Sequence, residues 1–372
     1  MLKINNSGPI EFKKYAKTKR IYIWGAGRAL ESCLEIYFSN QTIQGVFDSN
    51  SKLWGSSIQH YGANVTIGGK ELLCQHIKQS DISNCLLMIT SAYYGPEIVD
   101  ELDTIPELDG LECFLQAVIR TTKENIPAYS FTEGNQLIPK KIHYIWIGGN
   151  PLPQEFQENI KTWAKFNPDY EIIRWDENNY DFKKSTYVQE AYESKNFSFA
   201  TNYARLDIVY WHGGIYLDTD VECIANFDKL LNDKAFFNMG CTDRINMGCG
   251  FGAIPETEII ADMLAVFSEE HFIQKGQPSK VPFSTYIIPT MKRYGFRMEN
   301  YYQKLNDVVL YPCEVMSPQN INGMPDFMSK KTVSIHKESG TWRNETERAA
   351  RAKLTRFISE RITHKKSDEK TF

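Results

Sequence analysis

Short apolar runs and helical patterns alternate through the first third of the chain. Residues 21–24 form an apolar run that is followed by a turn containing Gly25 and Gly27, and then by apolar positions at helical spacing. The predicted strands are 21–24, 43–48 and 85–90, and the predicted helices are 29–38, 69–79 and 95–102. Such alternation is typical of a parallel sheet with crossover helices, so we expect an α/β domain over residues 1–125.

A second α/β domain is predicted from residue 138 onward. Between residues 120 and 137 the periodic pattern gives way to Thr, Lys, Glu, Asn, Pro and Gly, which is typical of a linker. The predicted elements that follow are a strand at 138–149 ending in two glycines, a helix at 155–166 and a strand at 170–175. We expect this domain to cover residues 138–345, with a basic helix and tail over residues 346–372.

Composition and charge narrow the function classes. Hydrophobic residues make up 42% of the 372 residues, which is enough to form two globular cores. The formal net charge of -4 gives no general attraction to phosphate backbones, so we expect no nucleic-acid partner. The apolar runs are far shorter than the roughly 20 residues that span a bilayer, and residues 1–20 lack the apolar core of a signal peptide. The 8 cysteines form no CxxC pair, as expected of buried thiols in a reducing compartment, and we expect a cytoplasmic protein.

The most informative segment carries two acids after a short strand. A predicted helix at 200–212 ends at two glycines, a buried strand follows at 215–217, and Asp218 and Asp220 come next. Residues two apart in extended chain point the same way, so both carboxylates are expected to face one point. Two such charges repel each other unless a cation lies between them, and Mg²⁺ or Mn²⁺ bound together with substrate phosphates fits oxygen ligands. The alternative interpretation is a turn held by Asx hydrogen bonds.

The segment as a whole resembles the DXD sugar-binding region of glycosyltransferase family 32. It is also similar to the glucosyltransferase domains of large clostridial toxins. The matching residues are Arg205, Gly213, Gly214, Tyr216, Asp218 and Asp220. Residues 138–149 resemble the family's opening strand, residues 166–177 resemble the stretch after its first helix, and the matches together cover about residues 138–342.

This resemblance implies a GT-A type catalytic domain that uses a nucleotide-sugar donor and a divalent metal, Mn²⁺ or Mg²⁺. It also implies transfer with retention of configuration, from a UDP-sugar to a glycan or lipid-linked acceptor, as in capsule or surface-polysaccharide biosynthesis. The implied catalytic residues are Asp218, Asp220 and Arg205. The implied donor contacts are Ile145, Trp146, Asn202, Arg205, Tyr216, Asp218 and Trp342. The implied metal ligands are Asp218, Asp220 and His336.

Several of these roles have structural alternatives. Trp146 could instead be a core residue at the end of a strand. Arg205 could instead pair with an acid such as Asp207, and His336 could be a structural histidine held by hydrogen bonds. The glycine-rich stretch 247–252 is interpreted either as an acceptor-side loop or as a plain tight turn. Asn202 stands where family members commonly carry Asp, which leaves the donor sugar open.

The amino-terminal domain supports a rival function. Gly25 and Gly27 follow a strand and open a helix, and Asp48 lies at the distance of a ribose-binding acid, as in a dinucleotide site. Leu30 replaces the third glycine, and the segment resembles Rossmann-like domains attached to bacterial surface-polysaccharide enzymes. The rivals to a sugar transferase are therefore an NAD-dependent oxidoreductase acting on a sugar nucleotide and a catalytically inactive glycan-binding protein.

The carboxy-terminal helix has a basic face beside an apolar one. Its basic residues include Arg348, Arg351, Lys353, Arg356 and Arg361, and its apolar residues are Leu354, Phe357 and Ile358. One interpretation is peripheral contact with the cytoplasmic face of a membrane. The other is a helix packed on the catalytic domain with a solvated outer face.

Overall fold

The computed structural model divides the chain into two compact units. Unit 1 comprises Met1–Glu124 together with Arg343–Phe372, and unit 2 comprises Asn125–Trp342. The described residues are 1–27, 29–91, 94–120, 122, 127–240, 244–319, 326–337 and 345–362. Each unit is α/β, so the α/β fold class predicted for both parts of the chain is confirmed.

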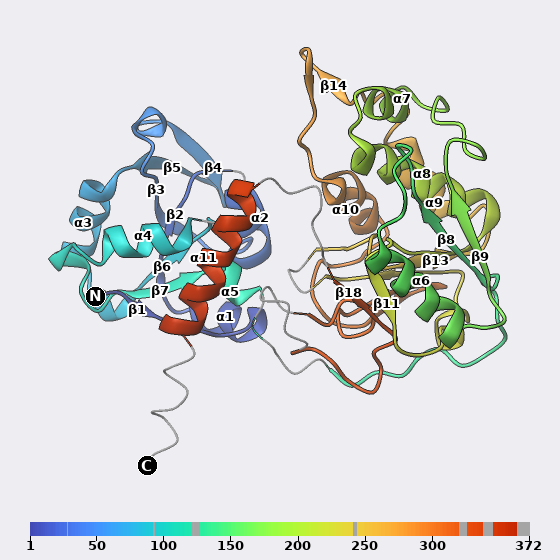
Figure 1. Cartoon of the computed structure of the whole chain (residues 1–372). Helices are drawn as coiled ribbons and strands as arrows, with labels where there is room; N and C mark the ends of the chain where they lie inside the picture. The colour runs from blue at the N-terminus through green and yellow to red at the C-terminus, as the bar shows by residue number, and fades with distance from the viewer. Residues whose placement is uncertain are drawn as a thin grey trace. The chain divides into compact units, whose positions relative to one another are not determined.

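Unit 1 is built on a seven-stranded sheet in the order β1-β7-β6-β2-β3-β5-β4 (Figure 1). All neighbouring strands are parallel except β4 and β5, which form an antiparallel hairpin at one edge. The strands are β1 (Lys3–Ile4), β2 (Arg20–Trp24), β3 (Ile43–Phe47), β4 (Ser57–His60), β5 (Ala63–Gly68), β6 (Cys85–Ile89) and β7 (Glu112–Leu115). The predicted strands β2, β3 and β6 lie side by side at the centre, where β6 is buried along its whole length.

Three helices of unit 1, at residues 29–37, 70–78 and 95–102, match the predicted crossover helices, whereas the helices at 9–16 and 116–119 were not predicted. The helices of this unit are α1 (Pro9–Ala16), α2 (Ala29–Tyr37), α3 (Lys70–Lys78), α4 (Gly95–Leu102), α5 (Gln116–Ile119) and α11 (Glu345–Arg361). Among the described residues of the whole chain, no helix combines the length and apolar character needed to cross a membrane.

The carboxy-terminal helix α11 packs on unit 1. Its residues Leu354 and Phe357 are buried, Lys353 Nζ lies 2.7 Å from a carboxylate oxygen of Glu97, and Arg361 Nη2 lies 2.8 Å from Asp103. The expectation that this helix packs on the catalytic domain is therefore wrong. An amphipathic pattern predicts that one face is buried but does not identify the surface that buries it.

Unit 2 is built on a second seven-stranded sheet, in the order β16-β17-β12-β13-β10-β8-β9. Its strands are β8 (Lys141–Ile145), β9 (Glu171–Trp175), β10 (Gly214–Tyr216), β12 (Ala235–Asn238), β13 (Phe251–Ala253), β16 (Gln303–Leu305) and β17 (Val308–Tyr311). Two small antiparallel pairs accompany it: β11 (Val221–Cys223) with β18 (Ser334–His336), and β14 (Ile273–Gln274) with β15 (Gln277–Pro278). The helices are α6 (Gln154–Phe166), α7 (Thr186–Glu193), α8 (Phe197–His212), α9 (Glu258–Ala265) and α10 (Phe283–Arg293).

Helix α8 leads directly into the central strand β10. The helix buries its middle turns, and the chain then reverses through Gly213 (φ +60°) and Gly214 (φ +99°). A Cβ on Gly214 would lie 2.8 Å from Lys141 Cβ and 2.9 Å from the Lys141 carbonyl, so only glycine lets β10 run this close to β8. The predicted helix with its end at the two glycines is confirmed, and it sets the starting point of β10.

His143 ties three elements of unit 2 together beneath this turn. Trp175 Nε1 donates to His143 Nδ1 at 3.1 Å, so the other ring nitrogen carries the hydrogen and donates to the Gly213 carbonyl at 2.7 Å. Burial lowers the pKa of His143 to about 4. The neutral imidazole therefore joins β8, β9 and the turn between α8 and β10.

The lowered pKa predicts acid sensitivity. In the unfolded chain His143 binds a proton below a pKa of about 6.5, whereas in the folded chain it does so only near pH 4. The free energy of unfolding that the neutral ring contributes is therefore complete above pH 6.5 and is lost as the pH falls toward 4. Between pH 7 and 4.5 the free energy of unfolding, measured with urea, should fall for both proteins. The fall should be smaller for His143→Gln than for the wild type, by about 2 to 3 kcal/mol. Glutamine can keep both hydrogen bonds but does not titrate. Equal losses in the two proteins would contradict this account.

Candidate active site

Asp218 and Asp220 lie in a turn directly after β10. The Val221 N–H donates to the Asp218 carbonyl at 3.1 Å, which closes the turn around Asp220. The expectation that extended chain brings the two carboxylates to one side is therefore wrong. The two acids do come together, but the turn and its neighbours bring them there.

Helix α6 holds the backbone of this turn. Asn159 Nδ2 donates to the Thr219 carbonyl at 2.9 Å, and Trp163 Nε1 donates to the Val221 carbonyl at 2.7 Å. All four of these residues are buried, and a buried carbonyl requires a hydrogen-bond donor. The turn is thus anchored by tertiary contacts, which the local pattern around the two acids does not reveal.

Three potential metal ligands converge at the turn. Asp218, Asp220 and His336 each offer one ligand atom, and these atoms all lie within 4.8 Å of one another. His336 comes from β18, which pairs with β11 so that His336 lies opposite Val221, and its Nε2 is 3.1 Å from Asp220 Oδ1. Two carboxylates in one small space form a donor set that suits a hard divalent cation. The structure therefore brings together the three residues that the resemblance implies as metal ligands.

Arg205 supports the first acid from helix α8. Its Nη2 lies 3.3 Å from Asp218 Oδ1, and the Tyr216 hydroxyl donates to the same oxygen at 2.9 Å. Burial alone would lower the pKa of Arg205, but the Asp218 charge raises it, and the net shift is upward. The alternative in which Arg205 pairs with Asp207 is wrong, because Asp207 contacts Lys184 at 2.7 Å instead. Arg205 is thus placed at the acid pair.

The glycine-rich stretch approaches the same acid from the other side. Gly248 accepts a hydrogen bond from the Asp218 N–H at 3.0 Å, and a Cβ on Gly248 would lie 2.2 Å from Asp218 Oδ2. That separation is far below contact distance, so the carboxylate occupies the space that a side chain would need. The stretch forms a turn at residues 247–249, and its backbone closely approaches Asp218. Its role on the acceptor side stays a prediction.

Gly248→Ala should therefore displace the Asp218 carboxylate and weaken metal binding. Changes beside metal ligands typically reduce affinity about 10- to 100-fold, and we expect a loss of this size for Mn²⁺ measured by calorimetry. Gly27→Ala is the control, because a Cβ on Gly27 in unit 1 would meet no atom within 4 Å. Unchanged Mn²⁺ affinity in Gly248→Ala would show that Asp218 does not contribute to a metal site.

The other predicted donor contacts are placed less directly. Trp146 is half-buried, with its Nε1 donating to the Asn150 carbonyl at 2.7 Å and its ring against Phe156, and Asn202 is half-buried on α8. The Ile145 side chain lies in the core, so only its backbone could face a ligand. Trp342 lies outside the described residues. The donor roles of these residues stay predictions.

Tyr216 is buried and holds Asp218. Its side chain is 2% exposed, and burial raises its pKa well above the usual value. The Arg205 guanidinium lies 4.8 Å from the centre of its ring. Its hydroxyl donates to Asp218 and so orients this acid, and its predicted contact with the donor stays a prediction.

The glycine turn of unit 1 uses its backbone groups internally. The Gly25 N–H donates to the Phe47 carbonyl at 2.7 Å, and the Ala26 N–H donates to Asp48 Oδ2 at 2.7 Å. Asp48 Oδ1 accepts a further hydrogen bond from the Asn50 N–H at 2.8 Å. A dinucleotide site instead presents such N–H groups to a pyrophosphate. The Asp48 carboxylate thus occupies a donor that the rival function requires.

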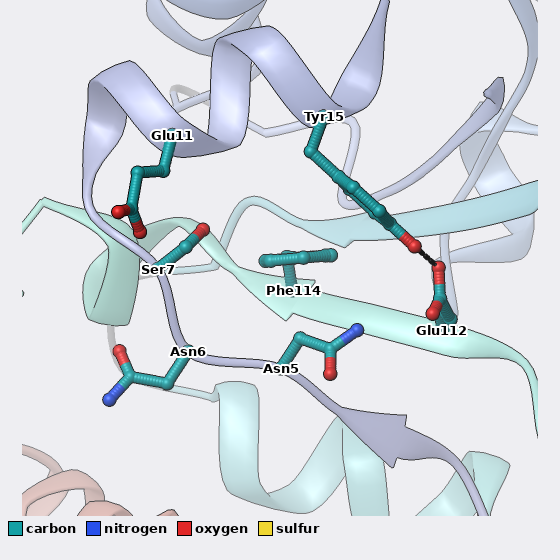
Figure 2. Close-up of a pocket in the computed structure, with 7 residues that line it drawn as sticks. All are labelled: Asn5, Asn6, Ser7, Glu11, Tyr15, Glu112 and Phe114. Atoms are coloured by element: carbon teal, nitrogen blue, oxygen red, sulfur yellow. Dashed lines mark hydrogen bonds between the residues drawn. The ribbon is translucent and has the colours of Figure 1, made fainter. Parts of the chain in front are cut away.

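A pocket of about 400 Å³ also lies in unit 1 (Figure 2). Its lining residues are Asn5, Asn6, Ser7, Glu11, Tyr15, Glu112 and Phe114. The Tyr15 hydroxyl donates to Glu112, and Lys19 lies 3.1 Å from the same carboxylate, which balances its charge. The lining includes no predicted site residue, so this pocket and the acid cluster of unit 2 are separate features.

A family comparison matches the segment that contains the acid pair. Residues 153–237 match the family described as glycosyltransferase sugar-binding region containing DXD motif. The match runs from the beginning of α6 to the end of β12 and includes Arg205, Asp218 and Asp220. This segment is a DXD glycosyltransferase region. The predicted resemblance, and the glycosyltransferase class that it implies, are confirmed for this region.

Several proteins are similar over part of their length. Inositol phosphoceramide mannosyltransferase 3 of Schizosaccharomyces pombe is 33% identical over 112 residues, which are 28% of this chain and 31% of that protein. Subversion of eukaryotic traffic protein A of Legionella pneumophila is 32% identical over 117 residues, covering 24% of this chain and 18% of that protein. Among solved structures, the PaToxG glycosyltransferase is 19% identical, covering 42% of this chain and 70% of its own, with a TM-score of 0.34. The chain spans less than a third of the length of these two curated relatives.

Proposed function

We propose that this protein is a metal-dependent glycosyltransferase that moves a sugar from a nucleotide-sugar donor. The observation that supports this most is the convergence of Asp218, Asp220 and His336, whose ligand atoms lie within 4.8 Å of one another. Asp218 and Asp220 belong to the region that matches a DXD glycosyltransferase family. A turn held only by Asx hydrogen bonds would not need a histidine from a distant strand beside its second acid. The arrangement instead has the composition of a cation site.

In the proposed mechanism the two acids hold the cation and Arg205 holds the first acid. Asp218 and Asp220 would bind Mn²⁺ or Mg²⁺, and the ion would stabilise charge developing on the departing diphosphate. Arg205 and Tyr216 both contact Asp218 Oδ1, which restricts its rotation and leaves the other oxygen for a ligand. His336 lies at 3.1 Å from Asp220 and restricts the second acid in the same manner. Both carboxylates are thus oriented before a donor binds, which lowers the cost of binding.

For the donor and acceptor we propose a UDP-sugar and a glycan or lipid-linked acceptor, with retention of configuration. We further propose a cytoplasmic enzyme of capsule or surface-polysaccharide biosynthesis. Membrane contact through α11 receives little support, because Leu354 and Phe357 are buried, Lys353 pairs with Glu97, and Arg356 Nε lies 2.7 Å from Glu360.

Thermal stabilisation by nucleotides separates this function from its rivals. A ligand that binds the folded state raises the melting temperature by mass action, so UDP with Mn²⁺ should stabilise the protein more than either component alone. Stabilisation by NAD alone would favour the oxidoreductase, and stabilisation by neither nucleotide would favour the inactive glycan-binding protein. Strong stabilisation by GDP and none by UDP would contradict the uridine donor while keeping the transferase.

Asp220→Asn is the sharpest test of catalysis. Removing one carboxylate charge from the metal site should reduce metal-dependent hydrolysis of the nucleotide sugar by at least about 100-fold, a loss typical of removing one electrostatic contact to the developing charge. The melting temperature should stay near that of the wild type. Asp307→Asn is the matched control, since Asp307 is an exposed acid of the same unit that pairs with Lys234. A variant Asp220→Asn with nearly normal turnover would exclude the proposed site.

Asp218→Asn is a less suitable variant for that test. Arg205 is 6% exposed, and its guanidinium would lose the charge that compensates its burial. We therefore expect Asp220→Asn, but not Asp218→Asn, to leave the fold undisturbed.

A further inference from the structure

The pocket of unit 1 lies between helix α1 and the edge of the sheet. β1 is the edge strand, and its pairing with β7 places Lys3 opposite Glu112. Side chains alternate between the two faces of a strand, so Asn5, Glu112 and Phe114 point to the same face. Helix α1 covers this face, since the ring centres of Phe12 and Phe114 are 4.9 Å apart. The hollow of about 400 Å³ is what remains between the helix and the sheet.

The lining of this hollow is mostly polar. Figure 2 shows the side chains of Ser7 and Glu11 at one end, those of Tyr15 and Glu112 at the other, and the Phe114 ring between them. Cavities that stay empty are apolar, whereas a polar hollow holds water or a ligand. Its volume of about 400 Å³ lies in the range of roughly 300 to 1,000 Å³ that is typical of sites for small molecules.

Two side chains of the lining have unused hydrogen-bonding groups. Ser7 Oγ is buried without a hydrogen-bond partner among the described residues. The Asn5 side-chain amide has no partner within the described part of the chain either, although its backbone N–H donates to the Cys113 carbonyl at 2.9 Å. An amide and a hydroxyl can each donate and accept. Because an unpaired buried hydroxyl costs free energy, a ligand with hydroxyl groups of its own would be stabilised here.

The charges around the pocket disfavour an ionic ligand. Lys3 Nζ lies 3.3 Å from Glu112 Oε1, Lys19 Nζ lies 3.1 Å from Oε2, and the Tyr15 hydroxyl donates to the same carboxylate. A cationic ligand would therefore have to compete with two lysines for Glu112. A phosphate would meet the carboxylates of Glu11 and Glu112 and be repelled. The chemistry of the lining thus favours a neutral ligand with several hydroxyl groups.

We propose that this pocket binds a neutral saccharide unit, such as one hexose ring of a glycan. A sugar ring carries hydroxyl groups around its edge and apolar C–H groups on its faces. Asn5 and Ser7 pair with the hydroxyl groups, and the apolar ring of Phe114 lies against a C–H face. The pocket lies outside the region that matches the DXD family. This inference therefore goes beyond the proposed function and does not depend on it.

Saturation-transfer NMR of the full chain, without nucleotide or metal, tests the binding. The probes are the methyl glycosides of glucose, galactose, mannose and N-acetylglucosamine, each at millimolar concentration. At least one should bind the wild type, and Asn5→Ala should weaken its affinity at least about 10-fold through the loss of the amide's hydrogen bonds. Asn64→Ala is the matched control, because Asn64 is an exposed asparagine of unit 1 outside the pocket. A wild type that binds none of the four sugars would overturn the proposal.

Ser7→Ala separates binding from stability. Ser7 Oγ has no partner among the described residues, so its removal should not lower the melting temperature. The affinity for the saccharide should nevertheless fall about 3- to 10-fold, which is the worth of one neutral hydrogen bond. Unchanged affinity in either Ser7→Ala or Asn5→Ala would contradict the proposed site.

Asp220→Asn distinguishes this pocket from the candidate active site of unit 2. The variant should bind the methyl glycoside as the wild type does, because Asp220 does not line the pocket. Loss of saccharide binding in this variant would assign the sugar to unit 2 and overturn the proposal. If the wild type instead shows no hydrolysis of nucleotide sugars, the proposed function fails, and the saccharide titrations still decide the role of the pocket.

Discussion

The buried guanidinium of Arg205 is the constraint on which the geometry of the site depends. A charge that is 6% exposed needs a compensating charge nearby, and Asp218 supplies it at 3.3 Å. The ring centres of Tyr216 and Phe283 lie 4.8 Å and 5.7 Å from the Arg205 guanidinium, which also donates to Thr201 through Nε and Nη2. Since Arg205 belongs to α8 and Asp218 follows β10, this ion pair fixes the end of the strand against the helix.

The second acid is held from a different direction. The Asp220 carbonyl accepts from the Lys337 N–H at 3.0 Å, and its carboxylate meets His336, both next to the pairing of β18 with β11. Asp218 therefore depends on α8 and on the Gly248 turn, whereas Asp220 depends on the strand β18 near the end of the unit. The distance between the two carboxylates is set by how these elements pack, so we expect the replacement of each acid to have a different structural cost.

The part of the site that lies in one continuous segment could be predicted from the sequence. The helix, the two glycines, the strand and the acids follow each other directly, and each has a local signal. The turn at Asp220 could not be predicted, because Asn159 and Trp163 on α6 bend the chain through hydrogen bonds to its backbone. The contacts of Asn246 could not be predicted for a similar reason: an asparagine before a glycine-rich stretch carries no periodic signal, and its partners His336, Gly248 and Cys249 are set by the packed structure.

In unit 1, the spacing of two glycines and an acid is compatible both with a dinucleotide site and with a turn stabilised by the acid itself. Gly25, Gly27 and Asp48 have the order and separation of a dinucleotide site, and the strand, turn and helix that the pattern predicts are all present. The distinction rests on one contact, in which Asp48 turns its carboxylate toward the Ala26 N–H instead of presenting it to a ribose. A carboxylate there both consumes a donor and repels phosphate, so the turn is stabilised by the acid that a nucleotide site would reserve for its ligand. The spacing in the sequence determines where Asp48 lies along the chain, whereas the partner of its side chain depends on how the turn is packed.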